Sequence, residues 1–283
     1  MIRLIPGFTY HRKDGIESYG RSSDEQTAHE RGLKIYDELA ELGDHPWAGI
    51  YSTGGFPVNK TLYLAPESGF MYTMTTCVGL SEVNYGSATC EDGRLKLSLT
   101  LPSHNTWEEL NLASEFFLVP WGEQLYLVPP EKMMKFCEGF NSGSYPSFFF
   151  SKVKWGLGRY TKLAGLPEVP EEYKKYLLKE PLDAEILSVG EPKQNNFPVT
   201  LNWGSRHGLY SGMKLHVTLS ADSETRFLWN SLEITAVSET RANGIFQLRE
   251  DSQRIEPKPG WRLSAPRRWL EDDEVEESEP EAH

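Results

Sequence analysis

The stretch that decides the fold is residues 47–101, WAGIYSTGGFPVNKTLYLAPESGFMYTMTTCVGLSEVNYGSATCEDGRLKLSLTL. Apolar and polar residues alternate in its clearest segments. Phe70, Tyr72 and Met74 share one face of such a segment, and every second residue from Leu95 to Leu101 is a leucine. A period of two is that of a half-buried β-strand, and clusters of Gly, Pro, Asn and Asp mark the turns. The stretch therefore predicts an antiparallel meander that either closes into a barrel or packs as a sandwich.

Helices and one further strand segment are expected around this meander. Residues 22–42 predict a helix, because Ser22 and Glu25 have the spacing of a capping box and Gly43 suits the position just past a helix end. Residues 116–128 predict a strand in which Gly122 permits a turn or a bulge. Two more helices are expected at 130–141 and 170–178. We assign all of these elements to one helix-covered antiparallel β domain, residues 1–185.

A second domain follows a change in composition between residues 179 and 198. Five short segments rich in β-forming residues are separated by turn residues: FPVTLNW, MKLHVTLS, SLEITAVSE, NGIFQLRE and GWRLSAP. This pattern predicts a small β-barrel, SH3-like or OB-like, over residues 186–270. The predicted fold class is thus mainly β with a few helices (α+β): a helix-covered β-meander domain followed by a small barrel.

The charge of the chain is concentrated at its C-terminus. The formal net charge is −12, and residues 271–281, EDDEVEESEPE, contain eight acids and no base, so that the rest of the chain carries −4. We expect residues 271–283 to form a disordered acidic tail. Neither the net charge of the whole chain nor that of the chain without residues 271–281 is positive, as binding to a nucleic-acid backbone would favour. This argues against nucleic acid as a partner.

No stretch approaches the roughly 18 apolar residues that a membrane span needs. The first residues, MIRLIPGFTYHRKDG, lack the apolar core of a signal peptide. The expected location is therefore the cytoplasm, unless a leader has been removed.

The three cysteines, Cys77, Cys90 and Cys137, do not form a CxxC pair. Cys77 and Cys90 are close enough in the meander to form a disulfide in an oxidising compartment, and three reduced, mostly buried thiols are the alternative. A Cys137–His104 pair is conceivable, but Cys137 follows Phe136 in a predicted helix, which is typical of a core thiol. The chain contains no GxSxG, HExxH, calcium-loop or P-loop motif, so we expect no cofactor and no metal.

Residues 202–215, NWGSRHGLYSGMKL, contain three glycines spaced four residues apart, Gly204, Gly208 and Gly212. A loop that reverses tightly twice needs positive φ angles, which glycine adopts at little cost. Together with the later KPGWRL, this turn resembles the small β-barrel domains of MreC-type rod-shape proteins and of flagellar-assembly proteins of bacteria. The resemblance covers residues 198–265 and implies a small barrel with a role in assembly.

The meander itself, through CVGLSEVNYGSATCEDGRLKL, resembles the lipocalin-like or META-like small barrels of bacterial proteins. This resemblance implies a barrel fold and carries no ligand motif.

Two functions from different classes follow. The first is a non-catalytic binding or assembly protein whose partner is another protein. Its contact surface is expected in the loop 204–212, where Arg206, His207, Leu209 and Tyr210 combine charge, hydrogen bonding and large side chains. The alternative for this loop is that Leu209 and Tyr210 fold back and plug their own barrel.

The second function is a carrier or enzyme with a site inside the N-terminal barrel. The interior could hold a small apolar ligand, and the candidate lining residues are Tyr51, Tyr72, Met74 and Trp121. The alternative is that these side chains simply fill the core.

Overall fold

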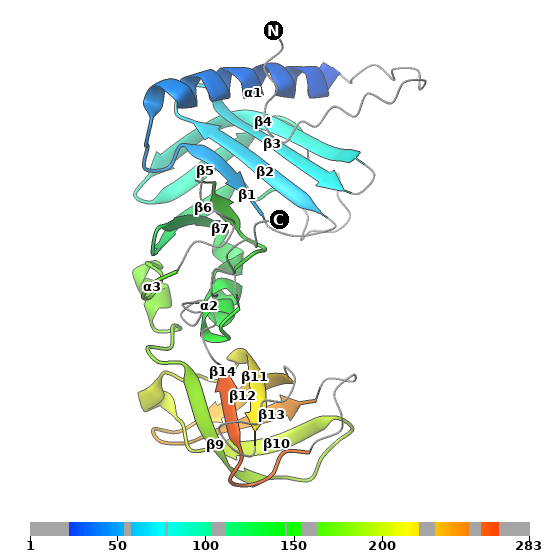
Figure 1. Ribbon diagram of the computed structural model, residues 1–283, viewed down its shortest axis with the longest axis vertical. Coiled ribbons are helices and arrows are strands. Elements are labelled where there is room, and N and C mark those ends of the chain that lie inside the picture. Colours follow the sequence, from blue (N-terminus) through cyan, green and yellow to red (C-terminus); the bar gives the residue numbers. More distant parts are fainter. Residues whose placement is uncertain are drawn as a thin grey trace, which may run out of the picture. The chain divides into compact units, whose positions relative to one another are not determined.

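The structure is a computed structural model. It describes residues 23–53, 58–76, 79–102, 111–144, 146–153, 163–220, 230–248 and 256–265. The protein is mainly β with a few helices, as the sequence predicts, and it divides into two compact units. One unit contains residues 1–130 and 147–161, and the other contains residues 131–146 and 162–283. Each unit is built around a closed antiparallel β-barrel (Figure 1).

The first barrel contains eight of the described strands, each paired with its neighbours along the chain. They are β1 (Gly49–Ser52), β2 (Asn59–Ala65), β3 (Gly69–Thr76), β4 (Gly79–Glu91), β5 (Arg94–Leu99), β6 (Glu115–Trp121), β7 (Gln124–Val128) and β8 (Phe150–Lys152). Pairing of β1 with β8 closes the ring. The meander therefore forms a barrel and not a sandwich. Gly122, with φ of 57°, makes the turn that divides the predicted segment 116–128 into β6 and β7.

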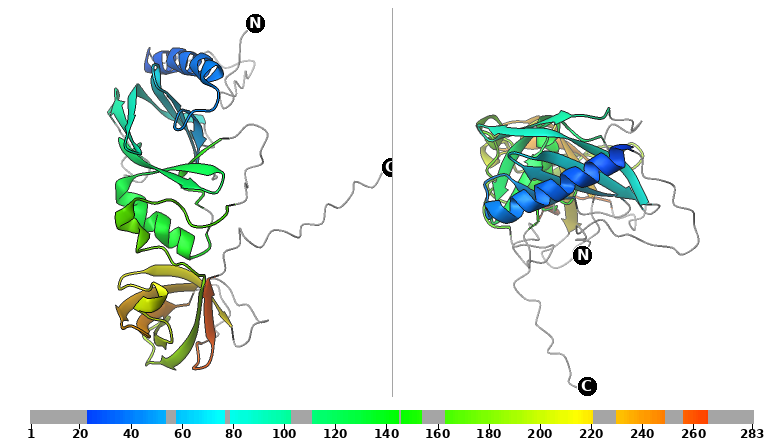
Figure 2. Two further views of the ribbon diagram at one scale, coloured as in Figure 1. Left: turned by 90° about the vertical axis from the view of Figure 1, so that its left-hand side faces the viewer. Right: turned by 90° about the horizontal axis from the view of Figure 1, so that it is seen from above.

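Successive residues of β3 face alternately the inside and the outside of this barrel. Phe70, Tyr72 and Met74 belong to the interior cluster of buried side chains. Met71, on the opposite face, is buried beneath the helix α1 (Ser23–Leu42), next to Ile35. The helix lies across the outer faces of β2, β3 and β4 (Figures 1 and 2). It ends at Leu42, and the next residue, Gly43, has a φ of 65°, the left-handed conformation expected just past a helix end.

The second barrel contains six of the described strands, in the order β10-β13-β12-β11-β14-β9. They are β9 (Leu182–Val189), β10 (Asn196–Leu201), β11 (Lys214–Ser220), β12 (Asn230–Val237), β13 (Ala242–Gln247) and β14 (Arg262–Ala265). Five of them are the predicted segments. The sixth, β9, lies inside the stretch that composition indicated as a crossing between domains. It closes the barrel by pairing with both β10 and β14.

Two helices group with the second barrel. They are α2 (Met133–Asn141), preceded by a 3-10 turn at Pro130–Lys132, and α3 (Glu171–Lys174). The Asn141 side chain donates to the carbonyl of Tyr176 at 2.8 Å and accepts the N–H of Leu178 at 2.7 Å. Leu178 in turn belongs to the core of the second barrel. The division therefore differs from the boundary between residues 185 and 186 that composition suggested, because composition does not show which side chains dock a helix.

Several predictions lie outside the described residues. These are the cap at Ser22, the acidic tail 271–283, and the candidate residues Cys77 and His104. Within the described ranges, no helix combines the length and the hydrophobicity that a membrane span requires.

Candidate functional site

A short turn between α1 and β1 is held by its own histidine. The Nδ1 atom of His45 accepts the backbone N–H of Ala48 at 2.9 Å, and the N–H of Trp47 approaches the same atom at 3.4 Å. A nitrogen that accepts these bonds carries no proton, so the proton of the neutral imidazole is on Nε2. The turn 44–48 therefore has a defined shape and a defined histidine tautomer.

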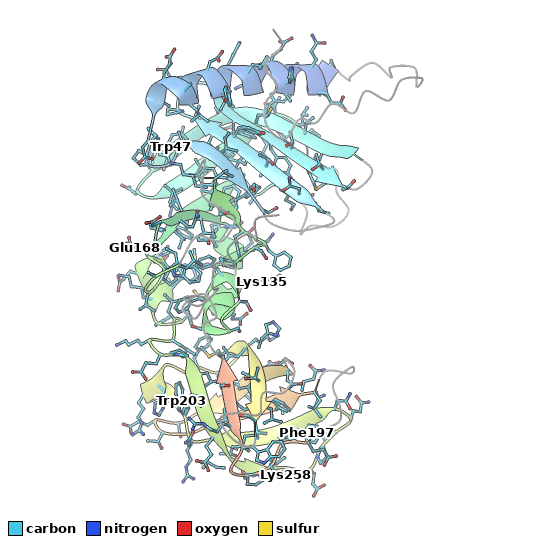
Figure 3. The ribbon with its side chains drawn as sticks, viewed as in Figure 1. Trp47, Lys135, Glu168, Phe197, Trp203 and Lys258 are labelled. Atoms are coloured by element: carbon cyan, nitrogen blue, oxygen red, sulfur yellow. The ribbon has the colours of Figure 1, made fainter. Side chains whose placement is uncertain are left out.

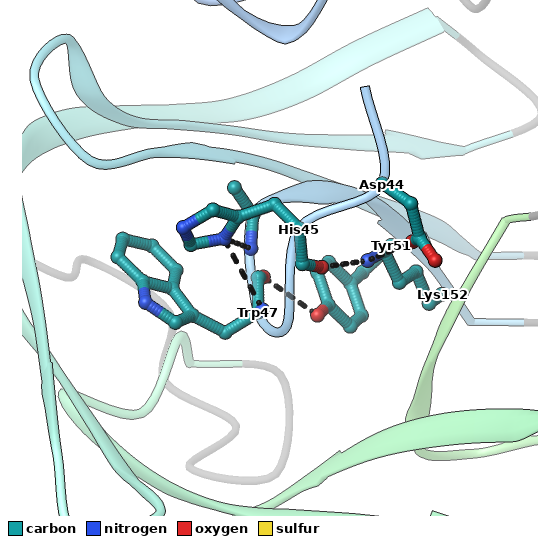
Figure 4. A network of polar contacts seen from close by, with 6 residues as sticks. Asp44, His45, Trp47, Tyr51 and Lys152 are labelled. Atoms are coloured by element: carbon teal, nitrogen blue, oxygen red, sulfur yellow. Dashed lines mark hydrogen bonds and ion pairs between the residues drawn. The ribbon is translucent and has the colours of Figure 1, made fainter. Parts of the chain in front are cut away.

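Lys152, at the end of β8, ties this turn to the barrel wall. Its Nζ atom donates to the carbonyl oxygen of His45 at 2.5 Å and lies 3.8 Å from a carboxylate oxygen of Asp44 (Figure 4). The Lys152 side chain is 17% exposed and Asp44 is fully exposed. The stem of Lys152 also passes over Gly49, where a Cβ atom would lie 2.7 Å from its Cε. Residues 107 positions apart in the sequence thus form one network.

The same turn contacts the interior of the barrel through Trp47, which is bonded to Tyr51 of β1. The Tyr51 hydroxyl donates to the carbonyl oxygen of Trp47 at 2.7 Å. Burial, and secondarily the neighbouring Cys90, raises the pKa of Tyr51, which keeps the hydroxyl protonated and available as a donor. Trp47, labelled in Figure 3, packs against the interior cluster. Its ring also meets that of His45 edge to face, with centroids 5.3 Å apart.

A cavity of about 980 Å³ opens beside this network. We call it the α1–β8 cavity, because its lining comes from α1, the turn 43–48, β1, the β6–β7 turn and the end of β8. Its polar and charged lining residues are Asp44, His45, Glu123, Gln124 and Lys152. The apolar lining residues are Tyr36, Leu39, Ala40, Pro46, Ala48, Ile50, Pro120, Leu125 and Val153. An apolar wall with a few polar groups is typical of a ligand site.

Three of the four residues predicted to line the barrel interior are brought together. Tyr51, Tyr72 and Met74 all belong to the interior cluster, in which the rings of Tyr72 and Phe150 lie 6.4 Å apart. Trp121 is buried outside this cluster, with its ring centroid 6.1 Å from that of Tyr126. It alternates with Pro120 at the end of β6, so it does not share the inward face of Phe116.

The hydroxyl of Tyr72 has no hydrogen-bond partner among the described residues, although its residue is fully buried. Burial, and secondarily Glu82, raises the pKa of Tyr72. A buried hydroxyl without a partner is costly, and it commonly marks a place for a water molecule or a ligand.

The loop 204–212 does not present its four candidate residues equally. Arg206 is exposed, His207 and Tyr210 are half-buried, and Leu209 is buried in the core of the second barrel. The Tyr210 ring meets that of Tyr176, with centroids 4.9 Å apart. Leu209 thus packs inside its own barrel, while the side chain of Arg206 is accessible to a partner.

His207 organises this loop, which lies near Trp203 (labelled in Figure 3). Its ring stacks on Trp203 with centroids 5.0 Å apart. Its Nδ1 is 3.0 Å from the backbone N of Gly204, and its Nε2 is 3.2 Å from Nε of Arg206. A neutral imidazole has only one acceptor nitrogen, and we assign it to Nδ1, which makes the shorter contact, within the turn.

The three glycines of the loop serve two different purposes. Gly208 and Gly212 have φ angles of 92° and 87°, which confirms the prediction of a positive φ at these two positions. At Gly204 the prediction of a positive φ is wrong, because its φ is −142°. A Cβ atom at Gly204 would lie 2.4 Å from the carbonyl oxygen of Ser238, so this glycine permits a close approach of two backbone segments.

The described cysteines carry free thiols. Cys90 is half-buried and Cys137 is fully buried. Burial raises the pKa of Cys137 to about 12, so at neutral pH it is a thiol and not the nucleophilic thiolate. Within the described part of the chain, no three His, Cys, Asp or Glu side chains lie close enough to hold a metal ion.

The sequence does not predict the α1–β8 cavity. His45 stands in no recognisable motif, and Lys152 follows the aromatic run at residues 148–150, which shows no clear period. The two meet because β8 closes the barrel against β1, which no local signal reveals.

Comparison of the chain with protein-family models, with curated proteins and with solved structures gave no match. The resemblances to small bacterial barrels therefore rest on the sequence motifs alone.

Proposed function

We propose that this protein is a non-catalytic binding protein and that the α1–β8 cavity is its binding site. The main support for the proposal is the cavity itself, about 980 Å³ in volume, with a wall in which apolar residues outnumber polar and charged ones. This volume is at the upper end of the range for small-molecule sites, which run from roughly 300 to 1,000 Å³. The wall is built by segments that the Lys152–His45 network holds together, so the site is preorganised.

The chemistry of the lining supports binding rather than catalysis. The described lining residues include no Ser, Thr or Cys that could act as a nucleophile. His45, the natural candidate for a general base, uses Nδ1 to accept the N–H of Ala48. Its other nitrogen then carries the proton and has no lone pair with which to accept another. The Lys152 ammonium is engaged by the His45 carbonyl and lies near Asp44, which keeps it in a structural role.

The proposal is tested by filling the cavity. Ala40 is an exposed residue of α1 that lines it, and Ala40→Trp places an indole ring there. Lys34→Trp, at another exposed position of the same helix, is the matched control. A fragment library is screened against the full chain by backbone amide chemical shifts. We expect hits that shift the amides of Ile50 and Leu125 and that Ala40→Trp abolishes while Lys34→Trp retains them. Hits that bind equally to both variants, or a screen without any hit at these amides, would overturn the proposal.

A second candidate is a carrier that holds a small apolar ligand inside the first barrel. The observation that favours it is the buried hydroxyl of Tyr72, which a polar group of a ligand would satisfy. Titration with a fluorescent fatty acid tests it in the wild type and in Tyr72→Phe. Binding that weakens at least fivefold in Tyr72→Phe supports the carrier. Absence of binding, or equal binding by both proteins, contradicts it.

A contact between the C-terminal barrel and another protein also remains a prediction. Of the four candidate residues for this contact, Arg206 is the most suitable because its side chain is exposed, whereas Leu209 is part of the core.

A further inference from the structure

The charges around the α1–β8 cavity are mostly negative. Asp44 and Glu123 are both exposed in the lining. Among the described lining residues, Lys152 is the one lysine or arginine, and its ammonium already bonds to the His45 carbonyl beside Asp44. A charged group that enters the cavity therefore meets a net negative field.

The end of α1 adds to this field. The last four carbonyl groups of a helix have no partner within the helix, and the helix dipole places partial negative charge at that end. Basic residues commonly compensate it, but the last turn of α1 contains none. Leu39, Ala40 and Gly43 at this end line the cavity, so the carbonyl-rich end of a 20-residue helix borders it. Both the carbonyls and the acids are acceptors that suit an ammonium or guanidinium donor.

Large apolar side chains at the cavity are partly open to solvent. Val153, which lines the cavity, is 40% exposed, and Leu42, which directly precedes the lining residue Gly43, is 38% exposed. Exposed large apolar side chains at the rim of a site are typical of contacts with a protein chain, because they add area that a small molecule does not cover. The size of the cavity and this apolar rim together favour a peptide segment over a small amine.

Resting on the proposed function, we propose that the α1–β8 cavity binds a basic, apolar peptide segment of a partner protein. Apolar side chains of the segment pack on the wall formed by Leu39, Ile50 and Leu125. An arginine or lysine side chain faces the last turn of α1 and the carboxylates of Asp44 and Glu123. The negative field provides the specificity, and the apolar wall provides most of the buried area.

Rhodamine-labelled octapeptides test this proposal by fluorescence anisotropy with the full chain at physiological salt. The first peptide alternates arginine and leucine. In the second, citrulline replaces arginine, which removes the charge and keeps the shape. In the third, serine replaces leucine, which removes the apolar groups and keeps the charge. We expect the first peptide to bind at least tenfold more tightly than either of the others.

Matched variants localise the effect. Asp44→Asn with Glu123→Gln should weaken binding of the arginine–leucine peptide at least tenfold. Glu30→Gln with Glu91→Gln changes the net charge equally, at exposed acids that do not line the cavity, and should change binding less than twofold. Equal weakening by the two double variants would show general electrostatic attraction and overturn the inference.

Amide chemical shifts separate failure of this inference from failure of the proposed function. If all three peptides shift the amides of Ala40, Ile50 and Leu125 with similar affinity, the cavity is a binding site but the basic, apolar preference is wrong. If no peptide shifts them while fragments do, the ligand is not a peptide and the inference is again overturned. If neither peptides nor fragments shift them, the proposed function itself fails.

Discussion

The carboxylate of Glu38 on α1 accepts a hydrogen bond from the backbone N–H of Ser68 at 2.8 Å, in the turn that joins β2 to β3. Its other oxygen accepts the N–H of Glu67 at 2.9 Å. On the same helix, Arg31 donates to the carbonyl oxygens of Ser68 at 2.8 Å and Gly86 at 3.1 Å. These hydrogen bonds add directional contacts to the apolar packing of α1 on the outside of the barrel. Because the C-terminal end of α1 lines the cavity, they also help to position one of its walls.

Replacement of Glu38 tests this anchor. Glu38→Ala removes the acceptor of two backbone donors and should lower the free energy of unfolding by about 1 kcal/mol. Glu41→Ala, at an exposed position of the same helix, removes the same charge and should change it by less than about 0.5 kcal/mol. Urea unfolding followed by circular dichroism measures both. Equal losses in the two variants would mean that the contacts with the β2–β3 turn contribute nothing.

The Glu38 contacts should also make stability depend on pH. Burial raises the pKa of Glu38, but the hydrogen bonds from Glu67 and Ser68 together lower it by more, so that its pKa in the folded protein is below the ordinary value of 4.5. A lowered pKa stabilises the fold above the unfolded-state pKa, and this stability is lost as the pH falls through the folded-state pKa. The difference in unfolding free energy between wild type and Glu38→Gln should therefore be largest near pH 7 and shrink below about pH 4.5. Urea midpoints at pH 7 and pH 3.5 measure it, and a difference that grows at pH 3.5 contradicts the assignment.

The sequence predicts the barrels well because their strands repeat locally. Phe70, Tyr72 and Met74 alternate with outward residues within the eight-residue strand β3, and such alternation is typical of a half-buried strand. The sequence does not predict the strand β9 (Leu182–Val189), because it lies where the composition changes and is followed by Gly, Pro and Asn residues that are typical of turns. Closure of the barrel by β9 depends on partners elsewhere in the chain, which local composition does not encode.

The candidate site was less predictable for a related reason. Its network joins Asp44 and His45 to Lys152 across the β1–β8 pair, and β8 has only three residues. A strand that short has too few positions for a period to be recognised. The sequence predicts a positive φ at Gly204 and not the close backbone approach to Ser238, because such an approach has no signal in the neighbouring sequence.

His45 substitutions test the turn beside the cavity. His45→Asn keeps a side-chain acceptor near the N–H of Ala48, whereas His45→Ala removes it. We expect the amide of Ala48 to exchange with solvent at least tenfold faster in His45→Ala than in the wild type, and less than threefold faster in His45→Asn. Hydrogen exchange followed by nuclear magnetic resonance measures the rates. Equal protection in the alanine variant would show that Nδ1 does not hold the turn.

The two purposes of glycine in the loop 204–212 predict different costs. Gly212→Ala meets open space and is strained only by its φ of 87°, so it should cost about 1 kcal/mol of stability. Gly204→Ala has no such φ strain but must move the backbone at Ser238 and Arg241, which lie 2.4 and 2.5 Å from the added Cβ, and should cost about 3 kcal/mol. Thermal unfolding of the two variants compares them. A cost at Gly204 no larger than that at Gly212 contradicts the close-approach account.

Substitution of Asn141 tests which of the two units contains α2. It is fully buried, and its two side-chain bonds fix α2 to the segment that enters the second barrel at Leu178. Asn141→Leu keeps the approximate volume but removes a donor and an acceptor from buried backbone groups, which should cost about 3 kcal/mol. Ser142→Ala, which removes the acceptor of the His216 N–H at 2.9 Å, should cost about 1 kcal/mol.

If α2 belongs to the unit of the second barrel, amide exchange in Asn141→Leu should accelerate in β9–β14 and remain unchanged in β2–β4, because the loss acts on one cooperative unit. Acceleration confined to β1–β8 instead would place α2 with the first barrel and contradict the division described above.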